Sequence, residues 1–401
     1  MGADQQAQGE NLEARADSLF SAGQLPEAAL LYRKILRREP GRLDIQARLG
    51  RLALLDNNPP QAITQLAAVL NQGLRTKANW GALADAYLAH DELGPAALCY
   101  ERAGRTGLAG TLAVMADRVP WRITGAVDAV ELGWLAQTAQ PIIQAEVNGT
   151  RVNLLVDTAA GDLALDEKVA IAAGIPHGGR ESLHFAGGQS AMVTYGQVER
   201  LQLGALTIHD VLTQILDLQN GFAAYTPAAP IHGILGIAIL SRFLTVLDFQ
   251  RRTLRLQAVT ATMKTASRGG QQNASPMWLA DNQFVLVRAE TPSHASAMWV
   301  IDTGMTGAGF AVSASTAESL GLAPRGGEGE EGLGGGGAVQ GKRVILPTLR
   351  LGGIERHDIE GIVLETFPLQ ERFGFQLAGL LACEFFQDAV LSLDFSSMTL
   401  T

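Results

Sequence analysis

Two aspartates, each followed directly by threonine, are the residues of this 401-residue chain best suited to do chemistry together. Asp157 follows the largely apolar run 152–156, and Asp302 follows the apolar run 298–301, 145 positions after the first aspartate. A single Asp-Thr is more simply explained as a turn, in which the aspartate accepts hydrogen bonds from nearby backbone N–H groups. Two carboxylates held about 3 Å apart behave differently, because they cannot both ionise cheaply and therefore share one proton. One carboxylate can then take a proton from water while the other protonates a carbonyl oxygen.

The segments around the two aspartates repeat the same features in the same order. A short helix-like stretch follows each Asp-Thr pair and ends at Gly174 or Gly321. Four later motifs recur 146 to 148 positions apart: Leu201–Gly204 with Leu349–Gly352, His209-Asp210 with His357-Asp358, Gly233–Gly236 with Gly379–Ala382, and Leu247–Phe249 with Leu393–Phe395. Short apolar runs separated by Gly, Pro and polar residues indicate β-strands. The sequence therefore predicts two homologous lobes of short strands, residues 141–258 and 275–401.

The tripeptides that carry the aspartates resemble the active-site loops of pepsin-like and retropepsin-like aspartic peptidases, in which each lobe supplies one aspartate. They are Asp157-Thr158-Ala159 and Asp302-Thr303-Gly304, and Ile234-Leu235-Gly236 matches a later motif that packs beside the loop in that family. The resemblance implies a two-lobed, pseudo-twofold β-fold that acts as an endopeptidase on a peptide or protein substrate, active as a monomer. It implies Asp157 and Asp302 as the catalytic pair, with no metal or other cofactor. Thr158 and Thr303 are expected to hydrogen-bond across to the opposite loop and hold the aspartates coplanar.

Two positions depart from the family pattern. Ala159 stands where the family has glycine, and Ala382 replaces the glycine of the second lobe's apolar-apolar-Gly motif. Glycine allows close backbone approach and unusual backbone angles, so a methyl group at the first position is expected to widen or tilt the pair. Both aspartates are present, which favours an active enzyme. The alternatives are a catalytically inactive peptide-binding module derived from a protease, and a scaffold in which the helical repeats do the work.

Two glycine-rich stretches, residues 184–189 and 326–337, lie between the Asp-Thr loop and the later strands of each lobe. In the family that the loops resemble, a flap covers the substrate at this place, and glycine supplies the freedom that a lid requires. The flap candidates are Phe185, Gly187, Gly188, Gly334 and Gly335. An ordinary surface loop is the alternative for each stretch. Residues 327–332 also fit a dinucleotide-binding pattern of glycines, but the three glutamates among them would repel a pyrophosphate, so we exclude that cofactor.

The amino-terminal quarter of the chain repeats every 34 residues with helical periodicity. The register is carried by three sets of residues: Ala16, Gly50 and Ala84; Ala28, Ala62 and Ala96; and Tyr32, Leu66 and Tyr100. Residues 80–100 and Pro40 resemble the tetratricopeptide repeat, which implies that residues 9–110 form three helical hairpins that bind a protein partner. Hairpins that merely cap the enzyme are the alternative. Pro120 and Pro141, with Gly125, Gly133 and Gly149 nearby, mark a change to short β-type runs. Residues 111–140 are therefore expected to link the helices to the lobes, so the fold class is an α-helical domain followed by an all-β one.

Composition restricts the partners and the surroundings. The net charge of -9 argues against nucleic acid or an anionic membrane surface as the main partner. Cys99 and Cys383 fall in different predicted domains and show no metal-ligand spacing. No apolar run approaches the roughly 20 residues that span a bilayer. The first residues lack the features of a signal peptide, and a periplasmic or secreted location after processing is preferred to a cytoplasmic one.

Overall fold

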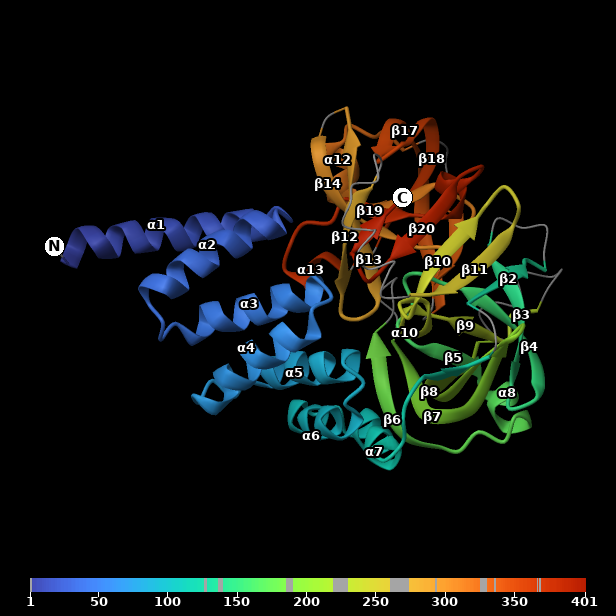
Figure 1. Ribbon diagram of the computed structural model, residues 1–401. Coiled ribbons are helices and arrows are strands. Elements are labelled where there is room, and N and C mark those ends of the chain that lie inside the picture. Colours follow the sequence, from blue (N-terminus) through green and yellow to red (C-terminus); the bar gives the residue numbers. More distant parts are fainter. Residues whose placement is uncertain are drawn as a thin grey trace.

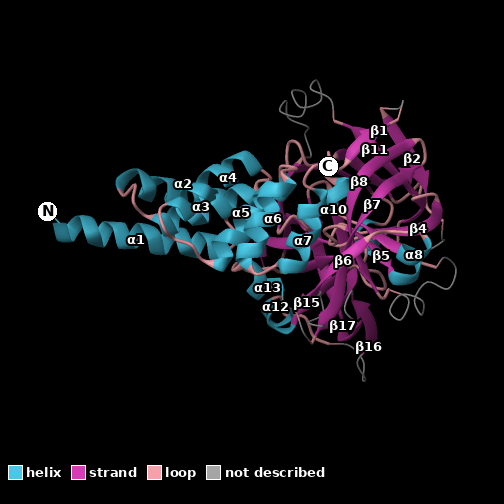
Figure 2. Cartoon of the chain, turned by 90° about the horizontal axis from the view of Figure 1, so that it is seen from below, coloured by secondary structure: helices cyan, strands magenta, loops and turns pink. Residues whose placement is uncertain are grey.

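The structure is a computed structural model, and it describes residues 2–125, 128–135, 140–184, 190–218, 230–259, 274–292, 294–324, 330–334, 337–365, 367 and 369–401. An arm of helices leads from the amino terminus and packs along two neighbouring lobes of strands (Figure 1). The helices α1 to α7, within residues 2–115, gather on one side of the molecule and most strands lie on the other, with the short helix α8, Glu167–Ala172, among the strands (Figure 2). This arrangement confirms the predicted fold class of helical repeats followed by a two-lobed β-fold.

The arm contains seven helices among the described residues, and the first six pair into hairpins. Their bounds are α1 Gly2–Ser21, α2 Leu25–Arg38, α3 Leu43–Leu55, α4 Pro59–Asn71, α5 Lys77–Ala89, α6 Leu93–Ala103 and α7 Thr106–Met115. The side chains of Asn58 and Thr76 cap the first turns of α4 and α5. No helix among the described residues is long and apolar enough to cross a membrane.

Small residues occupy the helix crossings, as the 34-residue repeat predicts. Ala28, Ala62 and Ala96 have no exposed surface. At Gly50 an added Cβ would lie 2.7 Å from Cγ of Leu66, so the two helices of that hairpin approach too closely for any larger residue. The repeat in the sequence therefore reflects a repeated packing requirement.

We expect Ala62→Leu to destabilise the chain by about 1–3 kcal/mol, because three extra carbon atoms cannot fit at a filled helix crossing. Ala113→Leu, at an exposed position of α7, is the matched control and should leave the melting temperature nearly unchanged. Thermal melts of the two variants test this expectation. Equal melting temperatures for Ala62→Leu and the unmodified chain would show that the crossing is loosely packed.

The first lobe is built on a sheet with strand order β1-β8-β5-β9-β4-β3-β7-β6. The strand bounds are β1 Arg122–Thr124, β3 Ile142–Val147, β4 Thr150–Val156, β5 Leu163–Asp166, β6 His177–His184, β7 Ser190–Leu203, β8 Leu206–Leu216 and β9 Gly233–Leu235. Two short helices, α8 Glu167–Ala172 and α10 Ile237–Leu240, follow β5 and β9. Strand β4, which leads to Asp157, pairs in parallel with β9.

The second lobe repeats this order within a larger sheet, β16-β17-β18-β15-β19-β14-β13-β12-β21-β20-β10-β11-β2. The strand bounds are β2 Ala129–Gly133, β10 Phe243–Asp248, β11 Thr253–Ala258, β12 Ser275–Ala280, β13 Phe284–Thr291, β14 His294–Ile301, β15 Phe310–Ser313, β16 Glu330–Gly334, β17 Gly337–Leu351, β18 Ile354–Leu364, β19 Gly379–Leu381, β20 Val390–Asp394 and β21 Thr399–Leu400. Helices α12 Ala314–Ser319 and α13 Leu369–Phe373 and a 3₁₀ turn, Cys383–Phe386, complete the lobe. The run β18-β15-β19-β14-β13 matches β8-β5-β9-β4-β3, so the duplication seen in the sequence is a duplication of topology.

The duplicated Leu-Asp-Phe motifs join the two lobes. Their strands, β10 and β20, pair antiparallel with each other, and Leu247 lies opposite Leu391. Asp248 and Asp394 accept hydrogen bonds from backbone N–H groups in the turns that follow. These two aspartates are therefore structural.

The helical arm contacts both lobes. On the first lobe, the Arg105 side chain donates to Glu181 at 2.6 Å and to the Tyr195 hydroxyl at 2.7 Å. On the second lobe, Arg288 donates to the Gly23 carbonyl at 2.6 Å, and the Asn282 side chain donates to the Asp85 carbonyl at 2.9 Å. The segment between arm and lobes is also structured in part, since it holds the end of α7 together with β1 and β2, which pair into the lobe sheets.

Candidate active site

The two aspartates stand at equivalent ends of two central strands. Asp157 follows β4, and its backbone N–H donates to the Leu235 carbonyl on β9 at 3.1 Å. Asp302 follows β14, and its N–H donates to the Leu381 carbonyl on β19 at 2.9 Å. The apolar-apolar-Gly strand and its counterpart therefore hold the start of each aspartate loop, in the place that the sequence comparison of the lobes suggests.

Four reciprocal hydrogen bonds join the two loops. The Thr158 hydroxyl donates to the Ile301 carbonyl at 2.7 Å, and the Thr303 hydroxyl donates to the Val156 carbonyl at 2.8 Å. Each hydroxyl oxygen in turn accepts the backbone N–H of the other threonine, at 3.1 and 3.2 Å. Both threonine side chains are fully buried. The structure thus brings both Asp-Thr pairs to the interface between the lobes and fixes one loop against the other.

Backbone N–H groups orient each carboxylate. Oδ1 of Asp157 accepts the N–H of Ala159 at 2.7 Å. Oδ1 of Asp302 accepts the N–H groups of Gly304 and Met305 at 3.0 and 2.9 Å. Both aspartates are half-buried as whole residues, beside the fully buried threonines. The backbone therefore sets the orientation of both carboxylates.

Burial raises the pKa of both carboxyl groups well above the usual aspartate value. For Asp157, the N–H groups of Ala159, Ala160 and, from the other lobe, Gly304 oppose this rise in pKa. For Asp302, the neighbouring negative charge of Asp157 adds to the rise in pKa, and the N–H groups of Met305 and Gly304 oppose it. The two carboxyl groups therefore titrate as one pair, in which the pKa of each depends on the charge of the other.

Gly304 is required by the close approach of the opposite aspartate. A Cβ at this position would lie 2.6 Å from both Cγ and Oδ2 of Asp157. Neither Gly304 nor Ala159 has a backbone angle in the left-handed region, so φ does not demand glycine at either place. Ala159 packs beside apolar residues of the second lobe's core. The two loops are thus unequal, and the carboxylate of Asp157 seats closely on Gly304.

A difference in loop length accompanies the alanine at position 382. In the first lobe, a Cβ on Gly236 would lie 2.5 Å from the Asp162 carbonyl oxygen and 2.6 Å from that of Ala160. The second loop is two residues longer between its aspartate and the next strand. There the N–H of Ala382 donates to the Gly309 carbonyl at 3.0 Å, and the alanine is fully buried. The longer loop leaves room for the methyl group, so Ala382 does not displace Asp302.

Two glutamines that the sequence did not single out reach the aspartate loops. Gln140 donates from Nε2 to the Gly304 carbonyl at 2.8 Å, and Gln283 donates from Nε2 to the Ala159 carbonyl at 2.7 Å. Each glutamine belongs to the lobe opposite the loop that it contacts. A signal was present in the sequence, because a glutamine stands just before the corresponding strand, β3 or β13, in each half.

The flap candidates lie at or beyond the ends of two hairpins. Phe185, Gly187 and Gly188 fall between β6 and β7, outside the described residues, and so does Gly335 between β16 and β17. Gly334 is the last residue of β16 and pairs with Gly337. The hairpins that carry both stretches are thus present in both lobes.

The other candidate residues have local partners. The His209 ring lies 2.8 Å from the Thr124 hydroxyl, and the His357 ring lies 3.2 Å from the Thr348 hydroxyl. Asp210 and Asp358, which follow these histidines, both have left-handed φ angles, so the shared motif marks a shared backbone conformation. Within the described residues, no group of three His, Cys, Asp or Glu side chains is placed to hold a metal ion.

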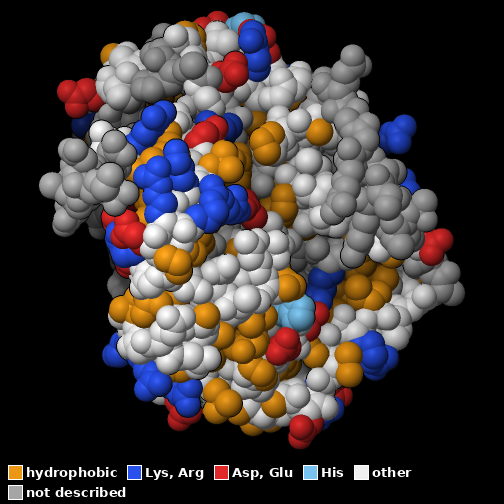
Figure 3. Space-filling model, turned by 60° about the vertical axis from the view of Figure 1, so that its left-hand side comes forward, with side chains coloured by type: hydrophobic (Ala, Val, Ile, Leu, Met, Phe, Trp, Pro, Cys, Tyr) orange, Lys and Arg blue, Asp and Glu red, His pale blue; other side chains and the backbone are white. Residues whose placement is uncertain are grey.

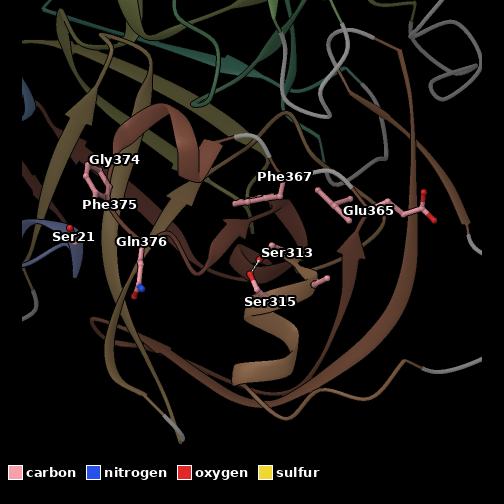
Figure 4. A pocket seen from close by; sticks show the side chains of 10 residues that line it. Ser21, Ser313, Ser315, Glu365, Phe367, Gly374, Phe375 and Gln376 are labelled. Atoms are coloured by element: carbon pink, nitrogen blue, oxygen red, sulfur yellow. Dashed lines mark hydrogen bonds between the residues drawn. The ribbon is translucent and has the colours of Figure 1, made fainter. Parts of the chain in front are cut away.

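A hollow of about 590 Å³ lies apart from the aspartates, where the end of α1 meets the second lobe (Figure 4). Its lining includes Ser21, Ser313, Ser315, Glu365, Phe367 and Phe375, and it contains neither aspartate. The hydroxyl groups of Ser313 and Ser315 lie 3.0 Å apart and bond to each other. The Gln376 N–H donates to the Ser21 carbonyl at 2.8 Å, so the hollow lies at a contact between arm and lobe.

Known families match both parts of the chain. The aspartyl protease family matches residues 143–239 and again residues 289–385, and the tetratricopeptide repeat matches residues 19–87. The chain is thus similar to the aspartyl protease family in two places and to the tetratricopeptide repeat in its helical arm. The duplicated match coincides with the two lobes, as the resemblance of the loops predicted. No curated protein matches the chain.

Two solved structures are similar to separate parts of this aspartyl-protease-like chain. A retropepsin-like aspartic protease from Rickettsia conorii shares 17% identity, with 34% of this chain and 95% of that chain covered, at a TM-score of 0.25. The first tetratricopeptide repeat domain of Spaghetti (RPAP3), solved with the HSP90 peptide SRMEEVD bound, shares 15% identity, with 27% of this chain and 89% of that chain covered, at a TM-score of 0.24.

Proposed function

We propose that the chain is an aspartic endopeptidase in which Asp157 and Asp302 act together on a bound water molecule. The observation that carries this proposal is the set of reciprocal hydrogen bonds through Thr158 and Thr303, which holds the two aspartate loops face to face. The member of the pair that is charged takes the proton from water. The other member keeps the shared proton and gives it to the carbonyl oxygen of the scissile amide.

The test is digestion of a mixed peptide library by the full chain, with the products identified by mass spectrometry. Cleavage should be abolished by a statine-type inhibitor, which mimics the tetrahedral transition state of this reaction. Cleavage that survives this inhibitor would assign the activity to another site. No cleavage at any pH between about 3 and 8 would reject the endopeptidase.

A non-catalytic peptide-binding module is the second candidate, and Ala159 is the residue that favours it. Its methyl group stands where the matched family has glycine, in the loop that must approach Asp302. Such a module would bind the statine-type inhibitor or a peptide without cutting any member of the library. Binding measured by calorimetry, together with the digestion, separates the two functions.

The tetratricopeptide-repeat arm is proposed to bind a protein partner or substrate. Figure 3 shows the side of the molecule from which the arm projects, and there Lys, Arg, Asp and Glu side chains are interspersed with apolar ones. The sequence suggested that the repeats act on recruitment and leave the chemistry to the lobes. The contacts between the arm and both lobes argue against this separation of recruitment from chemistry. Asn282 bonds to Asp85 of the arm, and its neighbour Gln283 bonds to Ala159 in the aspartate loop.

We therefore expect a fragment beginning at residue 120 to be less stable than the full chain and to turn over short peptides at least about tenfold more slowly. Removing the arm exposes apolar residues that are now buried against it, among them Trp278 and Met298. It also frees the turn that leads to Gln283. Thermal melts and steady-state rates on one short peptide test this expectation. A fragment with the melting temperature and turnover of the full chain would restore the simple division between recruitment and chemistry.

A further inference from the structure

The two glutamines form a pseudo-symmetric pair across the lobe interface. Gln140 precedes β3 of the first lobe and binds the carbonyl of Gly304, while Gln283 precedes β13 of the second lobe and binds the carbonyl of Ala159. Gly304 and Ala159 hold the same position in their loops, two residues after the aspartate. Gln140 is 5% exposed, so its contact is sheltered from water. Like the threonines, each glutamine binds a carbonyl of the opposite lobe, and the glutamines bind the last residue of each tripeptide.

Each of these carbonyl groups belongs to the peptide unit whose N–H supports an aspartate. The carbonyl of Gly304 is joined to the N–H of Met305, which donates to Oδ1 of Asp302 at 2.9 Å. The carbonyl of Ala159 is joined to the N–H of Ala160, which donates to the backbone carbonyl of Asp157 at 3.4 Å and also opposes the rise in the pKa of the Asp157 carboxyl group. A trans peptide places its C=O and N–H on opposite sides. The glutamine that donates to the carbonyl oxygen and the acceptor of the N–H are therefore linked through one peptide group in a continuous chain of hydrogen bonds. Hydrogen bonds in such a chain polarise and strengthen one another.

We propose that Gln140 and Gln283 are positioning residues, each of which fixes the aspartate of the opposite lobe through a single peptide group. The proposal rests on the proposed function of the aspartates. Gln140 acts on Asp302 through the 304–305 peptide, and Gln283 acts on Asp157 through the 159–160 peptide. Neither glutamine reacts. Each aligns one peptide plane. Gln140 also makes the Met305 N–H a stronger donor to the Asp302 carboxylate, while Gln283 holds Ala159, whose own N–H donates to the Asp157 carboxylate.

The helical arm supports one half of this pair. Gln283 follows Asp281 and Asn282, whose φ angles of 53° and 52° form a tight left-handed turn between β12 and β13. The Asn282 side chain bonds to the Asp85 carbonyl on α5, and Asp281 forms an ion pair with Arg372. The turn is therefore tied both to the arm and to the second lobe, which fixes the side from which Gln283 reaches Ala159.

Other titratable groups near the loops have partners of their own. Asp162 accepts a hydrogen bond from Gln214 at 2.8 Å. Glu384 accepts from the Thr306 hydroxyl at 2.6 Å and from the Gly307 N–H at 2.7 Å. The Cys383 thiol donates to the Thr303 carbonyl at 3.0 Å, and burial raises its pKa. A shift in the titration of the aspartates that follows a glutamine substitution can thus be separated from these groups.

The test uses Gln140→Met and Gln283→Met in the full chain, because methionine nearly keeps the volume of glutamine and removes the donor. Gln197→Met is the matched control, since Gln197 donates a hydrogen bond of 2.7 Å to Asp210, outside the aspartate loops. The first readout is the pH profile of peptide cleavage. We expect both limbs of the profile to move to higher pH by about 0.5 pH unit in each glutamine variant, because the charged carboxylate loses support. We expect kcat to fall about tenfold with little change in KM, and the control to match the unmodified chain.

The second readout does not need activity. Titration of the carboxyl carbons of Asp157 and Asp302 by NMR, assigned with the two Asp→Asn variants, should show the same upward shift in both glutamine variants. If the unmodified chain cuts nothing but its carboxyl titrations move with Gln140 and Gln283, the positioning survives and the endopeptidase fails. Folded variants whose titrations and profiles equal those of the unmodified chain would overturn the positioning role. A uniform loss of rate at every pH, with unshifted titrations, would overturn it as well.

Discussion

Asp157→Asn and Asp302→Asn should each lower kcat at least about 100-fold, because each change removes the shared proton on which both steps of the proposed hydrolysis depend. Asparagine nearly preserves the shape of aspartate, and its carbonyl oxygen can still accept the N–H groups that now bind Oδ1. Folding should therefore be retained. The kcat of the double variant should be no lower than that of the less active single variant, since the two residues work as one unit.

The same two substitutions should also make the chain more stable at neutral pH. Burial raises the pKa of both carboxyl groups in the folded state, so the folded chain holds their protons more tightly than the unfolded chain. Their contribution to stability is complete below the unfolded pKa and is lost as the pH rises through the folded pKa. Asparagine does not titrate, so each variant avoids this loss, and we expect a melting temperature about 2–4 °C above that of the unmodified chain near pH 8.

Thermal melts of the unmodified chain and the two asparagine variants at pH 4 and pH 8 test the direction of this change in melting temperature. The advantage of the asparagine variants should widen as the pH rises. A variant that melts below the unmodified chain at pH 8 would show that the carboxylates are stabilised in the folded state, contrary to their burial. Full activity in either variant would remove that aspartate from the mechanism.

Gly304→Ala should be nearly as damaging to activity as loss of an aspartate. The added Cβ would lie 2.6 Å from Cγ and Oδ2 of Asp157, a separation that real Cβ atoms do not show, so the carboxylate must move. Displacing a reacting group by about 1 Å costs on the order of 100-fold in rate. Steady-state kinetics should show the loss in kcat.

Gly161→Ala is the matched control, because a Cβ there would meet its nearest atoms, in the Gln283 side chain, at 3.6 Å, an ordinary contact. That variant should keep its rate. Ala159→Gly tests the opposite change: if its methyl group tilts the pair, glycine should raise kcat. Equal rates for Gly304→Ala and Gly161→Ala would mean that activity does not depend on the close contact between the Asp157 carboxylate and Gly304.

The duplication in the sequence was sufficient to predict the two lobes and the meeting of their loops. Asp157, Asp302 and the two threonines fall in strongly patterned surroundings, where an apolar strand ends in the same dipeptide twice. The burial of Ala28, Ala62 and Ala96 followed from spacing alone. These features repeat because each copy meets the same local packing requirement.

The partners in contacts between distant segments could not be predicted from the sequence, even where a residue recurs in both halves. Gln140 and Gln283 bind backbone carbonyls across the lobe interface, and a backbone carbonyl leaves no mark on the residue type that presents it. Arg105 and Glu181 join the arm to the first lobe in the same way, through a pair 76 residues apart. The room for Ala382 arises from a loop two residues longer than its counterpart, a difference in length that the motif itself does not contain.

Asp157 and Asp302 are proposed to act as one pair, and the most direct test is a crystal structure of the full chain with a statine-type peptide bound. We expect the statine hydroxyl to lie between the two carboxylates, within about 3 Å of an oxygen of each, in the place of the attacking water. Carboxylates more than about 6 Å apart, or an inhibitor bound elsewhere on the chain, would show that the two aspartates do not act together.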